Sequence, residues 1–172
     1  MPSQEAKGSA MDQYQASPAM GADMANQLPH SVELSGRPAP RLLVIDDDIV
    51  HRVVIGKVGD RAGFSITEAA SFDEAAKFLR KERFDCITLD LSLGSNYGLE
   101  IIHLLADIGC KTPIIVISGA GPSVAKLAIS VGRMRRLNIC EPVSKPIDFA
   151  LLKEILARIK GNYDNQRDQR TP

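Results

Sequence analysis

The feature that most constrains the fold is an alternation, starting at Arg41, of short apolar runs with segments of helical periodicity. Five runs of β-prone residues have the length of strands. They are RLLVI (41–45), FSITEA (64–69), FDCITLD (84–90), TPIIVISG (112–119) and the weaker LNICE (137–141). Because near-continuous apolar strands that alternate with helices form parallel sheets covered on both faces, we predict a doubly wound, five-stranded α/β domain.

Each of these runs is followed by a segment whose apolar residues recur at helical spacing. The second helix is expected to begin at Ser71, which forms a capping box with Glu74. Asp148 is expected to cap the last helix, and Gly161 to lie just past its end. The predicted inward faces are Ile49, Val50, Val53, Val54 and Val58; Phe72, Ala75, Ala76 and Leu79; Leu99, Ile102 and Leu105; Val124, Leu127, Ala128 and Val131; and Phe149, Leu152, Ile155 and Ile159.

Polar residues stand at the ends of four of the five predicted strands. They are Asp46, Asp47 and Asp48 after the first, Asp90 at the end of the third, Ser118 at the end of the fourth, and Lys145 beyond the fifth. Open parallel sheets bind ligands at this edge. Grouped carboxylates repel one another unless a cation lies among them, and carboxylate oxygens suit Mg²⁺. A carboxylate can also act as a nucleophile and form an aspartyl phosphate, which a hydroxyl and an ammonium group would stabilise.

Taken singly, each of these residues also has a structural explanation. We interpret Asp48 as the N-cap of the first helix rather than as a metal ligand. Asp90 alone could start a loop, and Ser118 or Lys145 alone carries little weight. The inference of phosphoryl chemistry therefore depends on all of these residues occurring together.

The sequence resembles the receiver domains of bacterial two-component response regulators over roughly residues 41–160. The motifs LVIDDD, ITLDLSLGSNYGLE, IIVISG and SKP occur in the family's order, with 44 residues from Asp46 to Asp90, 28 from Asp90 to Ser118 and 27 from Ser118 to Lys145. The resemblance implies a flavodoxin-like fold with strand order 2-1-3-4-5. It implies that Mg²⁺ is held by Asp46, Asp47, Asp90 and the backbone carbonyl of Ser92, that Asp90 is the phosphoacceptor, that Ser118 and Lys145 contact the phosphoryl group, and that the Lys145–Pro146 bond is cis.

Pro142 departs from the family's pattern, because receivers usually have an aromatic residue three positions before the lysine. The resemblance therefore implies that the family's aromatic switch is missing here, with Gly119 and Gly121 as another source of loop freedom. The segments GRMRRLN and SKPID are similar to receivers that precede cyclic-di-GMP phosphodiesterase domains, although no such output domain follows in this sequence.

Two segments differ in composition from residues 41–160. Residues 1–40 contain almost no large aliphatic residues and are predicted to form a disordered extension, and residues 161–172 a polar tail. The 21 basic and 21 acidic residues cancel, so no overall charge favours nucleic acid. Because no run approaches the roughly 18 apolar residues of a membrane span, and three cysteines without a C-x-x-C pair suit reduced thiols, we expect a cytoplasmic protein without membrane contact.

Our leading hypothesis is a single-domain response regulator that is not an enzyme in the ordinary sense. Asp90 would accept a phosphoryl group from a sensor histidine kinase or a histidine phosphotransfer protein. The fourth helix, fifth strand and fifth helix would then signal to a downstream effector protein, and the same face could form a homodimer. One alternative, supported by Pro142, is a phosphate-independent interaction module. A haloacid-dehalogenase-type phosphatase fits less well, because its nucleophile comes on the first strand and its acid pair last.

Overall fold

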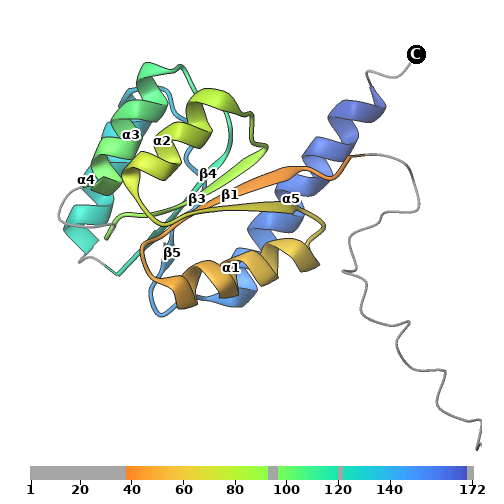
Figure 1. Ribbon diagram of the computed structural model, residues 1–172, viewed down its shortest axis with the longest axis horizontal. Helices are drawn as coiled ribbons and strands as arrows, with labels where there is room; N and C mark the ends of the chain where they lie inside the picture. The colour runs from red at the N-terminus through yellow and green to blue at the C-terminus, as the bar shows by residue number, and fades with distance from the viewer. Residues whose placement is uncertain (1–37, 93–96, 120–121, 170–172) are drawn as a thin grey trace, which may run out of the picture. The chain divides into compact units, whose positions relative to one another are not determined.

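The computed structural model describes residues 38–92, 97–119 and 122–169 of the chain (Figure 1). Within these ranges, five strands alternate with five helices. They are β1 (Arg41–Ile45), α1 (Ile49–Arg61), β2 (Ser65–Ala69), α2 (Phe72–Lys81), β3 (Cys86–Asp90), α3 (Tyr97–Asp107), β4 (Ile114–Ser118), α4 (Pro122–Met134), β5 (Val143–Ser144) and α5 (Phe149–Asp168). The predicted extension at residues 1–40 lies almost wholly outside the described ranges.

The strands form one parallel sheet in the order β2-β1-β3-β4-β5, which confirms the predicted doubly wound topology. Helices α1 and α5 cover one face of the sheet, and α2, α3 and α4 cover the other (Figure 1). Because all strands run the same way, the carboxyl ends of β1, β3, β4 and β5 meet at one edge. None of the described helices is long and apolar enough to cross a membrane.

The sheet separates two apolar clusters, one under each layer of helices. The cluster beneath α2, α3 and α4 includes Ile45, Leu89, Ile102 and Val116. The cluster beneath α1 and α5 includes Val44, Ile55, Ile117 and Leu152. Every residue of β3 and β4 is buried, as expected for central parallel strands covered on both faces. The two clusters hold the carboxyl edge of the sheet in a fixed geometry.

The predicted helix caps are present. The Asp48 carboxylate accepts hydrogen bonds from the backbone N–H groups of Val50 and His51, and Asp148 accepts in the same way from the first turn of α5. Ser71 accepts from the backbone N–H of Glu74. Asp48 is therefore occupied as a cap, as its position predicted.

The inward face predicted for α1 was wrong in its first two turns, although Val58 packs against the core as predicted. Ile49 and Val50 are each 64% exposed and Val53 is also exposed, whereas Ile55 and Gly59 face the sheet. The helix carries two apolar stripes, and the stripe that contains Gly59 is the one that packs on the sheet. There is no room for a side chain at this position, because a Cβ at Gly59 would lie 2.6 Å from a Leu42 methyl carbon. The side chains of Leu127 on α4 and Phe149 on α5 are likewise exposed rather than buried.

The ends of the last two elements also differ from the prediction. Residues 137–141 make only an isolated bridge, between Ile139 and Ile114, and β5 itself begins at Val143. Between the Ile139–Ile114 bridge and the Val143–Ile117 pair, three residues of this edge segment (140–142) lie opposite two of β4 (115–116), which is a bulge that contains Pro142, where proline has no N–H to donate. Helix α5 continues through Gly161 to Asp168, because nothing after Gly161 stops it. The Lys145–Pro146 bond is cis, as predicted.

Replacing Thr88 by valine is expected to stabilise the fold. Thr88 on β3 is 1% exposed, and its hydroxyl has no hydrogen-bond partner among the described residues. It lies between Val44 and Ile115, on the apolar face toward α1 and α5. Valine has the same shape without the unpaired hydroxyl, so Thr88→Val should raise the free energy of unfolding by about 1 kcal/mol. Equilibrium denaturation would measure this, with the partly exposed Thr67→Val as control, and a destabilised Thr88→Val would contradict the expectation.

Candidate functional site

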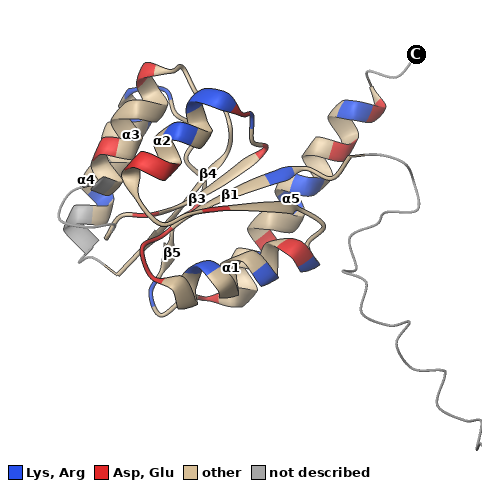
Figure 2. Ribbon diagram, viewed as in Figure 1, with Lys and Arg blue, Asp and Glu red and all other residues tan. Residues whose placement is uncertain are grey.

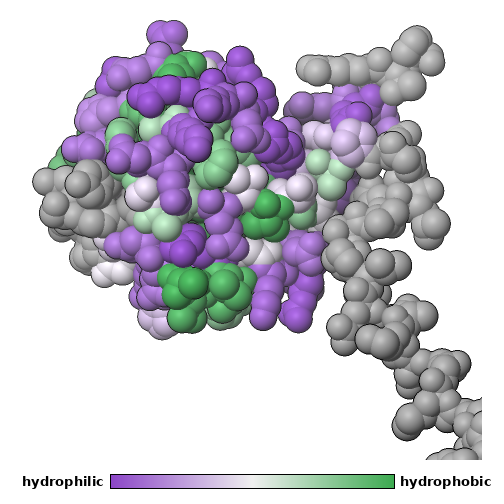
Figure 3. Space-filling model, in the orientation of Figure 1, coloured by the Kyte–Doolittle hydropathy of each residue, from purple (hydrophilic) through white to green (hydrophobic). Residues whose placement is uncertain are grey.

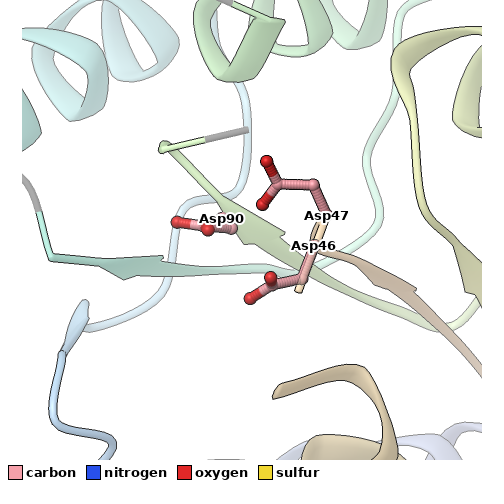
Figure 4. Close-up of side chains that lie close together, drawn as sticks. All are labelled: Asp46, Asp47 and Asp90. Carbon is pink, nitrogen blue, oxygen red and sulfur yellow. The ribbon is translucent and has the colours of Figure 1, made fainter. Parts of the chain in front are cut away.

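Three carboxyl groups converge at the carboxyl edge of the sheet. Asp46 and Asp47 follow β1, and Asp90 is the last residue of β3. One oxygen of each carboxylate lies within 4.8 Å of the others, and Figure 4 shows the three groups pointing into a common space. Asp46 is 1% and Asp90 2% exposed, whereas Asp47 is exposed. The site thus has two buried carboxylates and one open to solvent.

The ammonium group of Lys145 lies against the two buried carboxylates. Its Nζ atom is 2.7 Å from Asp90 Oδ2 and 3.2 Å from Asp46 Oδ2. Burial disfavours the charged form of Lys145, but hydrogen bonds to Asp90 and Asp46 and the charges of these carboxylates outweigh it, so the pKa of Lys145 is raised. The ammonium group therefore supplies the positive charge that the grouped carboxylates require.

The other predicted site residues lie at the same edge. Ser118 is the buried last residue of β4, and its backbone carbonyl accepts a hydrogen bond of 3.0 Å from the Lys145 N–H. Asp90 pairs with Ile117, so Ser118 lies one residue beyond Asp90 along the edge. Ser92 follows Asp90 in the loop, and its N–H donates to Asp90 Oδ1 at 2.9 Å. All the residues singled out in the sequence are therefore neighbours at one end of the sheet.

Two residues of α1 belong to the site although the sequence analysis did not include them. Arg52 Nη1 donates to the backbone carbonyls of Asp46 and Asp47, at 2.8 and 3.0 Å. His51 Nδ1 lies 3.0 Å from Lys145 Nζ. The Asp48 cap was the signal in the sequence that could have placed these two residues in the site, because it marks the start of the helix. Helical side chains lean toward the N-terminus, so those of the first turn reach back over the end of the preceding strand.

The first turn of α3 packs directly on the loop after β3. A Cβ at Gly98 would lie 2.6 Å from Leu91 Cα and 2.8 Å from the Leu91 carbonyl oxygen. Only glycine permits this approach, because the atoms in the way belong to the backbone. Gly98 thus fixes the path of the chain immediately after Asp90.

A cavity of about 340 Å³ opens between α4, β5 and the start of α5. Its lining includes Ser118, Ile129, Pro142 and Val143, so it reaches from the candidate site to the outer face of these elements. Pro142 has no large side chain to fill this space.

Comparison with known proteins decides the family. The family model described as the response regulator receiver domain matches residues 42–157. The chain belongs to the response regulator receiver domain family. Regulatory protein VirG of Agrobacterium fabrum is 35% identical over 137 residues, which cover 80% of this chain and 50% of that protein. VirG of Rhizobium rhizogenes is 32% identical over 119 residues, covering 69% of this chain and 46% of that protein. This receiver chain therefore spans about half the length of the curated relatives it matches.

Solved structures share the fold of this receiver domain. A response regulator from Colwellia psychrerythraea superposes with a TM-score of 0.66 at 22% identity, covering 72% of this chain and 98% of that one. A response regulator from Burkholderia pseudomallei, determined with a phosphorylated aspartic acid, a calcium ion and citrate, has a TM-score of 0.56 at 26% identity and covers 77% of this chain and 75% of that one.

Receiver domains bind Mg²⁺ at an acidic pocket, and the donor set of this receiver fits such an ion. Asp46, Asp47 and Asp90 each offer a carboxylate oxygen, the hard ligand that Mg²⁺ prefers, and exposed Asp47 leaves one side open to water or a phosphoryl oxygen. Figure 2 shows the acidic segment between β1 and α1 at this edge. The backbone carbonyl of Ser92 stays a prediction as a further ligand.

Mg²⁺ is expected to stabilise the receiver, because an ion that binds only the folded state adds its binding free energy to stability. MgCl₂ at ten times its dissociation constant should add about 1.4 kcal/mol. Thermal unfolding with MgCl₂ or with EDTA would measure the effect, which should shrink in Asp47→Asn and persist in Asp60→Asn, an exposed acid at the other end of α1. An equal rise of Tm in Asp47→Asn and in the wild type would contradict this metal site.

Gly98→Ala is expected to damage both stability and metal binding. The new methyl group must push the Asp90–Leu91 backbone aside, at a cost of about 2 kcal/mol. Gly161→Ala in α5 is the matched control, because a Cβ there meets nothing within 4 Å and alanine favours a helix. Denaturant unfolding and Mg²⁺ titration should show losses for Gly98→Ala alone. Losses of the same size in Gly161→Ala would show that close approach at Gly98 is not the cause.

Proposed function

We propose that Asp90 accepts a phosphoryl group from a sensor histidine kinase or a histidine phosphotransfer protein and thereby transmits a two-component signal. The observation that carries the proposal is the placement of the Lys145 ammonium 2.7 Å from Asp90 Oδ2, inside a group of three carboxylates. A buried carboxylate next to a fixed cation, at the mouth of a site open on one side, has the surroundings of a phosphoryl acceptor.

The transfer requires one bond to form and one to break. An Asp90 carboxylate oxygen bonds to phosphorus as the phosphorus–nitrogen bond of the donor histidine breaks, and the electron pair of that bond stays on the imidazole nitrogen. Asp46, Asp47 and Asp90 would hold Mg²⁺, which would supply positive charge for the phosphoryl oxygens. Lys145 and Ser118 stabilise the same oxygens, Lys145 through its charge and Ser118 through its hydroxyl.

The phosphoryl donor would dock on the start of α1. Ile49, Val50 and Val53 expose their apolar side chains there, in the first two turns after the Asp48 cap. Figure 3 shows a hydrophobic patch on the lower side of the molecule, where α1 lies in Figure 1. Exposed apolar residues beside a reactive site favour a protein donor over a small molecule alone.

The signal would leave through α4, β5 and α5. Lys145 follows β5 directly, and Ser118 lies between β4 and the loop to α4, so movement of either residue toward a phosphoryl group acts on these elements. The cavity lined by Ser118, Ile129 and Val143 gives α4 room to shift without a clash. An effector protein or a second copy of the chain would recognise this face. The Burkholderia structure supports the chemistry, because it holds a phosphorylated aspartic acid and a metal ion in a related fold.

A phosphate-independent interaction module is the second candidate. Pro142, in the edge segment that adjoins the cavity, favours it, because none of the described residues that line this cavity is aromatic. A free-standing receiver and a likeness to receivers that precede cyclic-di-GMP phosphodiesterase domains stay predictions from the sequence.

Intact-mass analysis with acetyl phosphate and MgCl₂ would test the proposed chemistry. We expect the wild type to gain about 80 Da, one phosphoryl group, because Asp90 is an activated carboxylate nucleophile. Asp90→Asn should gain nothing, and Asp85→Asn, an acid at the other end of β3, should react like the wild type. If the wild type gains no mass with either acetyl phosphate or a phosphorylated histidine phosphotransfer protein, the phosphate-independent module is the better description.

A further inference from the structure

The ammonium group of Lys145 has three acceptors, one for each of its protons. Two are the carboxylates, Asp90 Oδ2 at 2.7 Å and Asp46 Oδ2 at 3.2 Å. The third is the imidazole of His51, whose Nδ1 is 3.0 Å from Lys145 Nζ. Because a lysine ammonium has exactly three donors, these contacts fix both the position and the orientation of Nζ.

The contact with Lys145 favours one tautomer of His51, although the same Nδ1 atom also lies 3.5 Å from Asp46 Oδ2 and 3.8 Å from Asp48 Oδ2. An ammonium group has no lone pair, so the 3.0 Å contact is a hydrogen bond only if Nδ1 is unprotonated and accepts. The proton of the neutral ring then lies on Nε2. The side chain is 35% exposed, so the ring reaches from the buried lysine to the surface of α1.

We propose that His51 is a positioning residue for Lys145 in phosphoryl transfer, through the contact of its Nδ1 atom with Lys145 Nζ. The inference rests on the proposed phosphorylation of Asp90. When Asp90 receives the phosphoryl group, Lys145 must turn from the carboxylate to a phosphoryl oxygen, and His51 keeps one of its hydrogen bonds during this movement. A carboxylate at position 51 would hold Lys145 as well but would cancel the charge that the phosphoryl oxygens need, whereas a neutral imidazole does not.

The tautomer of His51 can be measured in the unphosphorylated protein. Long-range ¹H–¹⁵N correlation spectra of the imidazole rings, assigned with His51→Asn, should show Nδ1 unprotonated and the proton on Nε2 at neutral pH. Lys145→Met should change the ¹⁵N shift of His51 Nδ1. A ring protonated on Nδ1, or a shift that does not respond to Lys145→Met, would overturn the proposed contact. This measurement needs no phosphorylation, so it can fail or succeed independently of the proposed function.

The kinetic test compares two substitutions at position 51. His51→Leu removes the acceptor, and we expect the rates of phosphorylation by acetyl phosphate and of subsequent hydrolysis both to fall about fivefold, as for the loss of one hydrogen bond. His51→Asn places an amide oxygen where Nδ1 lies and should restore both rates to within about twofold of the wild type.

The matched control is His103 on α3, whose Nδ1 lies 2.9 Å from Arg135 Nη1 on the surface. His103→Leu loses a similar hydrogen bond away from the site and should leave both rates unchanged. The proposal is overturned if His51→Leu reacts at the wild-type rate, if His51→Asn is as slow as His51→Leu, or if His103→Leu slows the reaction equally. If the wild type itself is not phosphorylated, the proposed function fails, and the tautomer measurement alone decides the contact.

Discussion

The ion pairs of Lys145 with Asp46 and Asp90 are the interaction on which the site depends. Two carboxylates buried at the end of an apolar sheet would be costly without a cation, because like charges repel and burial removes their hydration. The lysine comes from a part of the chain 99 residues from Asp46 and 55 from Asp90. Only the parallel sheet brings these positions together, because the carboxyl ends of β1, β3 and β5 share one edge. The fold and the charge balance of the site therefore require each other.

The same ion pairs explain how phosphorylation could change the shape of the domain. A phosphoryl group adds negative charge and strong acceptor oxygens at Asp90. Lys145 would then have a stronger partner than the Asp90 carboxylate, and a shift of its side chain toward that partner would act on the chain after β5. The backbone hydrogen bond from Lys145 to Ser118 couples this movement to the end of β4. Helix α4 begins four residues after Ser118, and the adjoining cavity leaves space beside it.

Local signals in the sequence were enough to predict most of the fold and the acidic site. The first four strands and the caps at Asp48, Ser71 and Asp148 could be predicted because each depends on a sequence pattern of about ten residues or fewer. The buried face of α1 could not be predicted in this way, because both of its stripes are apolar and the choice depends on the space beside Leu42. The bulge before β5 depends on pairing with β4, which sequence does not display. The sequence did not place Arg52 and His51 in the site, because Arg52 binds backbone carbonyl groups and His51 contacts a lysine that is far away along the chain.

Helix α1 connects recognition to chemistry through its first two turns. On its outer side, Ile49, Val50 and Val53 are exposed. On its inner side, Arg52 holds the carbonyls of Asp46 and Asp47, and His51 contacts Lys145. The Asp48 cap fixes the rotation of the helix and so decides which residues face each way. Because a helical turn moves as a unit, a partner that presses on the outer residues also acts on the acid pair and on the lysine. A donor that docks on the outer side of α1, as proposed, would therefore also affect the alignment of the charged groups.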